Sequence, residues 1–283
     1  MKKQFPRTMV GGMSMPRLII GTNWFLGYSH TSHAKDLFIK AYQDRKKIAD
    51  ILVTFFEHGC NAVMSGNVPI IAEAMKEAED RTGMKGISIA APHFNIPGYH
   101  YQDGATMEHQ LDICAKMGVT FCFPHQCVTD ILIDKMARKI RQYTHISKAI
   151  RERSMIPGLS THMPEAVQIA DESDADVDTY IQIYNAQGFL MQVEVDWVMK
   201  VIHNAKKPVM TIKPLAAGQL LPIVGLGYVW NTLRDIDMVM IGTTTVEEAK
   251  EVIELSFDFL EKRLPDHQLQ ETRSKGMLRK LNQ

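Results

Sequence analysis

The feature that most constrains the fold of this 283-residue chain is an alternation along its whole length. Longer amphipathic segments separate eight short apolar runs of strand character. The runs are RLIIGT (17–22), NAVMSG (61–66), GISIAAP (86–92), TFCFPH (120–125), MIPGLST (155–161), TYIQIYN (179–185), PVMTIKP (208–214) and DMVMIGT (237–243). Near-continuous apolar runs are typical of strands covered on both faces. Eight βα units in one chain predict an α/β fold, a (β/α)8 TIM barrel.

The segments between these runs carry helical patterns with recognisable ends. Residues 34–59 predict one helix that ends at Gly59, and residues 129–153 predict another after the fourth run. No break in composition divides the chain, so we expect a single domain over residues 1–283. Within it, residues 6–18 contain a Gly-Gly turn and predict a hairpin that closes the bottom of the barrel, and residues 265–283 form a C-terminal tail.

Composition excludes several classes of function. Lys plus Arg and Asp plus Glu both number 32, so the formal charge is zero and no basic excess indicates a nucleic-acid or membrane partner. The four cysteines lack the spacing of a zinc ribbon or a disulfide framework, which favours reduced thiols in a cytoplasmic protein. The first 20 residues lack the apolar core of a signal peptide. We therefore expect a small-molecule ligand, while the oligomeric state is not predicted.

In a TIM barrel the working site lies at the C-terminal ends of the strands. His93 and His162 directly follow the third and fifth apolar runs, whereas His125 and Lys213 stand near the ends of the fourth and seventh runs. Side chains alternate along a strand, so we expect His125 to share a face with Phe123 and Lys213 to share one with Thr211 and Val209. The substrate-pocket residues that we expect at the other strand ends are Asn23, Trp24, Asn67, Asn95, Tyr184 and Asn185.

The three histidines suggest a metal-assisted enzyme. Neighbouring strands lie about 4.8 Å apart, so imidazoles from three adjacent strands can meet at one zinc-like ion. In this hypothesis His93, His125 and His162 are the ligands, while Lys213, with His125 and His93, acts on a carbonyl or hydroxyl substrate. The plainer alternative is that each histidine caps its strand through an ordinary hydrogen bond. No acidic side chain stands at a strand end, which argues against paired carboxylates and against a magnesium or calcium site.

Several stretches resemble the aldo-keto reductase superfamily. MPRLIIGTNW (15–24) is similar to its opening strand, and IPGLSTHMPEAVQIADESDADVDTYIQIYNAQG (156–188) resembles its strand-five and strand-six block. TIKPLAAGQL (211–220) and MVMIGTTTVEEAKEVIEL (238–255) resemble its Pro-Leu-x-x-Gly-x-Leu stretch and its final Ile-Gly segment with the cofactor helix. The resemblance covers most of the chain in architecture and is specific in the second half.

The resemblance implies a hydride-transfer site from which most of the catalytic tetrad is missing. Met64 stands where the family has Asp, Pro69 near its Tyr, and Pro92 or His93 at its Lys, whereas His125 matches the family's His. A methionine cannot pair with an ammonium and a proline cannot donate a proton, so the standard mechanism is excluded.

Some of the residues with which the family binds a nicotinamide have counterparts in this sequence. Ser160, Thr161 and Gln182 are expected to bind the carboxamide. Thr243 and Thr244 stand where the family has the cationic clamp for a 2′-phosphate, and no Lys or Arg is seen there. The resemblance thus leaves two alternatives to the metal-assisted enzyme. One is a divergent NAD(P)-dependent oxidoreductase with His125 as proton donor, and the other is a non-catalytic ligand-binding barrel. Schiff-base chemistry at Lys213 is a minor option.

Overall fold

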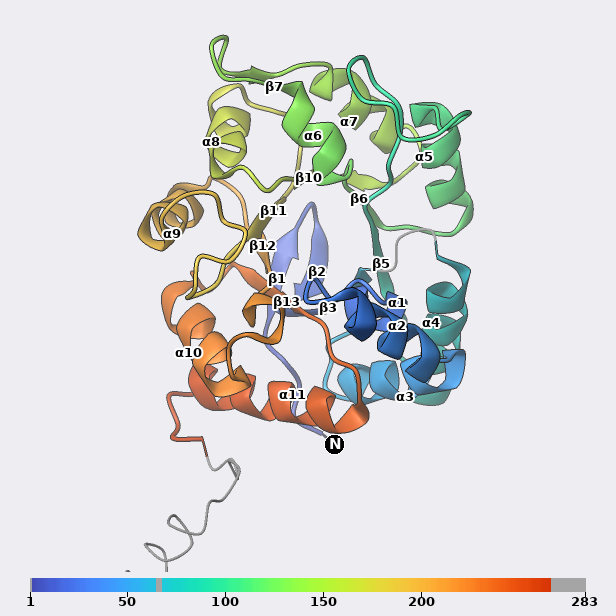
Figure 1. Cartoon of the computed structure of the whole chain (residues 1–283), viewed down its shortest axis with the longest axis vertical. Coiled ribbons are helices and arrows are strands. Elements are labelled where there is room, and N and C mark those ends of the chain that lie inside the picture. The colour runs from blue at the N-terminus through green and yellow to red at the C-terminus, as the bar shows by residue number, and fades with distance from the viewer. Residues whose placement is uncertain (1, 65–67, 266–283) are drawn as a thin grey trace, which may run out of the picture.

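The structure is a computed structural model and describes residues 2–64 and 68–265. Its parallel strand segments are β3 (Leu18–Ile20), β4 (Ala62–Met64), β5 (Ile87–Ala90), β6 (Phe121–Cys122), β9 (Ile156–Pro157), β10 (Leu159–Ser160), β11 (Tyr180–Ile183), β12 (Val209–Ile212) and β13 (Met238–Ile241). They form one sheet in the order β10-β11-β12-β13-β3-β4-β5-β6-β9 at the centre of the molecule (Figure 1). Each segment lies within one of the eight apolar runs, which confirms the predicted TIM barrel.

The fifth strand is divided in two by Gly158. Its first part, β9, pairs with β6, and its second part, β10, pairs with β11, so the two ends of the sheet meet within this strand. The Phe123 ring fills the space beside Gly158, where an added Cβ atom would lie only 1.7 Å from the Cε1 atom of Phe123. The buried Tyr143 hydroxyl donates a 2.6 Å hydrogen bond to the Gly158 carbonyl oxygen. The closure of the barrel therefore depends on a residue without a side chain.

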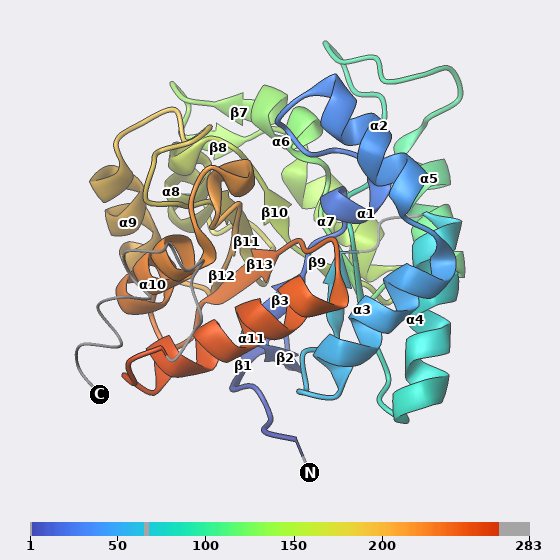
Figure 2. The same ribbon diagram turned by 60° about the horizontal axis from the view of Figure 1, so that its bottom comes forward.

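A short hairpin covers the N-terminal end of the barrel. Its strands β1 (Arg7–Val10) and β2 (Met13–Pro16) pair antiparallel within the 6–18 segment. Val10 and Met15 are buried in the same cluster as the inward-facing strand residues. Figure 2 shows the hairpin beneath the strands, close to the N-terminus. The open end of the barrel is therefore the opposite one.

A ring of helices surrounds the sheet (Figure 1). The helices of this ring are α3 (Arg45–Phe56), α4 (Pro69–Thr82), α5 (Met107–Lys116), α7 (Tyr143–Arg151), α8 (Pro164–Glu172), α9 (Val195–Asn204), α10 (Pro222–Thr232) and α11 (Val246–Leu260). Shorter elements lie in the connections: α1 (Asn23–Leu26), α2 (His33–Tyr42), α6 (Gln126–Leu132) and the 3-10 turn η1 (Ala216–Gly218). In the described part of the chain, no helix combines the length and the apolar character needed to cross a membrane.

Two predicted helices are wrong in extent. The helix predicted over 34–59 is divided into α2 and α3, because Asp44 caps a new helix by accepting a hydrogen bond from the Lys47 amide at 2.9 Å. The helix predicted over 129–153 contains a hairpin of β7 (Ile133–Asp134) and β8 (Lys139–Ile140) between α6 and α7. The Asp134 carboxylate accepts hydrogen bonds from Ala137 and Arg141, which stabilise this turn. Residues 266–283 of the expected tail lie outside the described residues.

The core has an inner layer and an outer layer. Ile19, Ile87, Ile89, Phe121 and Phe123 are among the side chains that fill the barrel, whereas a larger cluster packs between the sheet and the helices. His93 follows the end of β5 and His125 caps the beginning of α6, so both lie beyond the C-terminal ends of their strands. This places the two imidazoles at the end of the barrel opposite the hairpin.

Candidate functional site

Lys213 lies at the C-terminal end of β12, and its backbone conformation is unusual. Its φ of 61° lies in the left-handed region, which a residue with a side chain adopts rarely. Val209 packs in the outer cluster and Met210 in the inner one. The strand face that Lys213 was predicted to share with Val209 therefore points away from the inside of the barrel. The ammonium nitrogen reaches the open end of the barrel, where it lies 2.9 Å from the Nε2 atom of His30. Such local strain is common at functional sites.

The surroundings of Lys213 favour its neutral form. Burial lowers its pKa from the ordinary value to about 8. Desolvation and the nearby Lys213 charge also lower the pKa of His30, so this imidazole accepts the hydrogen bond from the ammonium. His30 in turn contacts the Asn23 amide nitrogen at 3.3 Å. Lys213 and His30 therefore place at the mouth of the barrel an ammonium group that gains or loses its proton near pH 8.

His93 and His125 are in direct ring contact. Their ring centroids lie 3.7 Å apart with a 34° interplanar angle, and Tyr101 stacks on the other side of His93 at 4.7 Å. Desolvation, followed by the charges of His93, His162 and Lys213, lowers the pKa of His125 to about 3. The Nδ1 atom of His125 accepts a 3.3 Å hydrogen bond from the Cys127 amide. His125 is therefore neutral near pH 7 and is unsuited to the proton-donor role predicted for it.

His162 lies close enough to His125 for its charge to lower the pKa of that imidazole. Desolvation and the charges of Lys213 and His30 lower the pKa of His162 to about 4. Its backbone amide donates to the Asp130 carboxylate at 3.3 Å, and the Thr161 hydroxyl donates to the same carboxylate at 2.5 Å. Burial raises the pKa of Asp130 to about 6. Asp130, which lies within α6 and not at a strand end, therefore holds the loop that carries His162.

The potential metal ligands that come together differ from the predicted set. Donor atoms of His93, His125 and Cys127 all lie within 4.8 Å of one another. His162 does not belong to this group, so the three-histidine ligand set is not formed within the described residues. Cys127 follows His125 by two residues at the start of α6, and this short spacing was the sequence signal for it.

The predicted cofactor residues divide into two groups. The Gln182 Oε1 and Thr243 Oγ1 atoms are buried without a hydrogen-bond partner among the described residues, and Ser160 is also buried. Thr161 is engaged by Asp130. The Thr244 amide is likewise engaged, because it donates to the Glu248 carboxylate at 2.5 Å.

The predicted substrate-pocket residues are only partly at the mouth. Asn23 contacts His30, and Trp24 packs against Gly242 and Gly218 at the ends of neighbouring loops. Asn95 instead orders its own loop by bonding to the backbone of Tyr101 and Gln102.

The remaining pocket residues are placed elsewhere. Tyr184 is fully buried, with its hydroxyl bonded to Tyr228 and Thr232 of α10, and Asn185 is buried with its side chain bonded to Phe189. Asn67 lies outside the described residues. The structure thus brings Asn23 and Trp24, but not Tyr184 or Asn185, toward Lys213.

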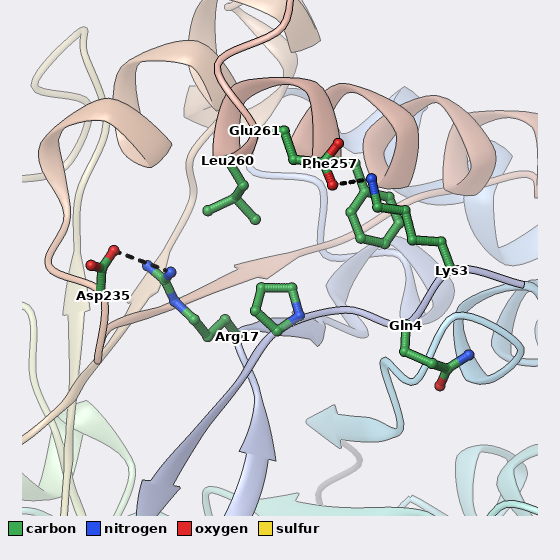
Figure 3. Close-up of a pocket in the computed structure, with 8 residues that line it drawn as sticks. Lys3, Gln4, Arg17, Asp235, Phe257, Leu260 and Glu261 are labelled. Carbon is green, nitrogen blue, oxygen red and sulfur yellow. Dashed lines mark ion pairs between the residues drawn. The ribbon is translucent and has the colours of Figure 1, made fainter.

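A second hollow lies at the opposite, N-terminal end of the barrel. This cavity of about 370 Å³ is lined by Lys3, Arg17, Asp235 and Glu261 among others (Figure 3). Lys3 pairs with Glu261, and Arg17 lies 3.6 Å from Asp235 while donating to two backbone carbonyls. These charges neutralise one another, whereas the charge of Lys213 at the mouth acts on His125 and His162, so we take the mouth as the candidate site.

The half-buried His162 leads to a prediction about how the free energy of unfolding depends on pH. Its pKa is about 4 in the folded chain and about 6.5 in an unfolded one, so the unfolded chain binds more protons between these values. The free energy of unfolding should therefore fall as pH is lowered from 6.5 to 4. Denaturant titrations across this range should show a shallower fall for His162→Gln, whereas the exposed-site control His145→Gln should keep the wild-type slope. Equal slopes in all three proteins would contradict the assignment.

Comparison with known proteins supports the fold. No family model matches the sequence, and no curated protein matches it. The structure is similar to a Pseudomonas aeruginosa protein assigned to the aldo-keto reductases, with a TM-score of 0.66 and 15% identity over 92% of this chain and 98% of the other. A glycerol dehydrogenase from Gluconobacter oxydans matches with a TM-score of 0.58 and 11% identity over 94% and 98%.

The similarity extends to other TIM barrels. An orotidine 5′-monophosphate decarboxylase from Methanocaldococcus jannaschii matches with a TM-score of 0.53 and 17% identity over 85% of this chain and 98% of that one. At identities this low the matches define architecture and not chemistry. The fold is an aldo-keto-reductase-like TIM barrel.

Proposed function

We propose that this chain is a divergent oxidoreductase that interconverts a carbonyl and a hydroxyl group on a small polar molecule, with Lys213 as its proton donor and acceptor. The observation that carries the proposal is the Lys213 ammonium, held 2.9 Å from His30 in the mouth of an aldo-keto-reductase-like barrel with its pKa lowered to about 8. A catalytic acid works best when its pKa lies near the operating pH. Lys213 meets this condition, and His125 does not.

The proton transfer can be described with residues of this chain. As charge develops on a carbonyl oxygen near Lys213, the ammonium donates its proton to that oxygen and stabilises it electrostatically. His30 accepts a hydrogen bond from Nζ, which orients the ammonium and leaves its other protons free for substrate. In the oxidation direction the neutral amine accepts the hydroxyl proton. Met64 and Pro69, at the family's Asp and Tyr positions, take no part in this transfer.

The predicted residues fit a nicotinamide without a 2′-phosphate. The Ser160 hydroxyl and the buried Gln182 Oε1 atom, which has no partner among the described residues, offer a donor and acceptors, which is what a carboxamide requires. When bound, a nicotinamide supplies the hydride. Glu247 and Glu248 occupy the first turn of α11, and Glu248 already binds the Thr244 amide. These acidic groups disfavour a further negative charge at that helix terminus.

Titration with NADH and NADPH, followed by quenching of protein fluorescence, tests the proposal. We expect NADH to bind more tightly than NADPH because of the Glu247 and Glu248 carboxylates. Ser160→Ala should weaken NADH binding by about fivefold to tenfold, since it removes one neutral hydrogen bond. Ser14→Ala, in the hairpin at the other end of the barrel, is the matched control and should bind as the wild type does. Absence of quenching by either nucleotide would contradict the proposed cofactor.

We do not propose metal-assisted catalysis as the function of this chain. Its expected third ligand, His162, does not join His93 and His125, and the similar structures with aldo-keto reductase descriptions favour the oxidoreductase alternative. Lys213 also explains the chemistry of the mouth without a metal ion.

A further inference from the structure

The cluster of His93, His125 and Cys127 is left unused by the proposed proton transfer. His93 follows β5, whereas His125 and Cys127 stand at the beginning of α6, so two neighbouring strand ends bring the three side chains together. All three are half-buried, and no carboxylate belongs to the group. We propose that His93, His125 and Cys127 form a binding site for a thiophilic metal ion of the Zn²⁺ type.

The geometry is close to that of a metal site. The donor atoms lie within 4.8 Å of one another. Around a tetrahedral ion with metal–nitrogen bonds of about 2.0 Å and a metal–sulfur bond of about 2.3 Å, ligand atoms are separated by about 3.3–3.5 Å. Small rotations of the three side chains bring their donor atoms from the observed separations, within 4.8 Å, to those of a tetrahedral site. Two imidazoles and one sulfur, with no hard oxygen ligand, select zinc or a softer ion over magnesium and calcium.

The groups around the cluster favour metal binding. The Gln126 amide nitrogen donates a 3.0 Å hydrogen bond to the Cys127 sulfur and so orients it. Hydrogen bonds from neighbouring groups commonly orient the ligands of a metal. Tyr101 stacks on His93 and restrains its ring. The contact from the Cys127 amide to His125 Nδ1 is long, at 3.3 Å, so a metal at that nitrogen replaces a weak interaction.

The ligand set does not depend on the proposed oxidoreductase activity. Lys213, His30 and Ser160 are not ligands, and His162, the third imidazole expected from the sequence, is not one either. A metal at this site ties the third βα loop to the fourth. An experiment can therefore contradict the metal site without contradicting the oxidoreductase proposal. Each of the two proposals is tested with its own variants.

Titration of the reduced, metal-free protein with Co²⁺ tests the site directly. A cobalt–thiolate bond gives a near-ultraviolet charge-transfer band, and we expect this band at one equivalent of Co²⁺ and its loss when Zn²⁺ is added. Cys127→Ser should abolish the band, and His93→Gln should raise the Kd for Co²⁺ by at least tenfold. His162→Gln should keep both the band and the affinity, as should Lys213→Met.

Two results would overturn the proposal. One is a wild-type protein without the thiolate band. The other is a band that persists in Cys127→Ser, because it would then come from another of the four cysteines. Cys60, Cys114 and Cys122 are buried, so they are unsuited to replace Cys127 without unfolding. Circular dichroism and thermal melting of each variant establish that it is folded before its Co²⁺ titration is interpreted. Loss of NADH binding with an intact cobalt band would contradict the proposed function alone.

Discussion

Lys213→Met is expected to lower kcat/KM for carbonyl reduction by about 10²–10⁴-fold, the usual contribution of a general acid. Methionine keeps the length of the side chain and removes its proton. Lys213→Arg should not restore the rate, because a guanidinium with a pKa above about 12 does not release its proton near neutral pH. Steady-state rates with NADH and a panel of small aldehydes and ketones measure the effect. Lys200→Met, on the exposed face of α9, is the matched control.

The pH dependence of the same reaction provides a second measurement. Reduction requires the ammonium form of Lys213, so kcat/KM should fall as pH rises through about 8, and the oxidation rate should rise over the same interval. This dependence should be absent from the residual rate of Lys213→Met. A variant within threefold of the wild type, or one with the wild-type pH profile, would show that another group donates the proton.

Gly158→Ala is expected to lower the free energy of unfolding by about 3 kcal/mol, at the upper end of the usual cost of overpacking. The added methyl group would lie 1.7 Å from the Phe123 ring, so the ring, the fifth strand or both must move. Moving the strand would also weaken the pairing of β9 with β6 and of β10 with β11. Denaturant-induced unfolding followed by circular dichroism measures the change.

A second substitution tests the steric cause. Combining Gly158→Ala with Phe123→Leu should cost less than the sum of the two single variants, since the smaller side chain makes room for the methyl group. Gly118→Ala is the control: its φ of 71° disfavours a side chain, but nothing lies near the added Cβ atom, so we expect a cost of only about 1 kcal/mol. Additive effects at positions 123 and 158 would argue against direct contact.

The barrel was predictable because each strand is an apolar run bounded by polar residues, a signal that does not depend on distant contacts. The hairpin of β7 and β8 was not, because the pattern of residues 129–153 also suits a helix. Its turn depends on side-chain contacts such as that of Asp134 with Arg141. Such interactions depend on the conformation already adopted and leave little trace in hydrophobic periodicity.

The site was predictable in part for related reasons. Alternation along the strands predicts that His93 and His125 share a site, and the structure places their rings in contact with each other. Alternation along the strand did not predict the direction of the Lys213 side chain, because the left-handed backbone at this residue breaks the alternation. His30 was not predicted as a site residue because it reaches Lys213 from a loop 183 positions earlier in the sequence. Loop geometry of this kind follows from the tertiary fold, and spacing along the chain does not reveal it.

In the part of the chain that the structure describes, no carboxylate pairs with Lys213, and this has a consequence for ligand binding. Its hydrogen-bond partner is the neutral His30, so the mouth changes its local charge when one proton is gained or lost. An anionic ligand stabilises the ammonium and raises the pKa of Lys213, and binding near pH 8 therefore takes up a proton from solution. Affinity for anions and proton uptake are thereby linked through a single side chain.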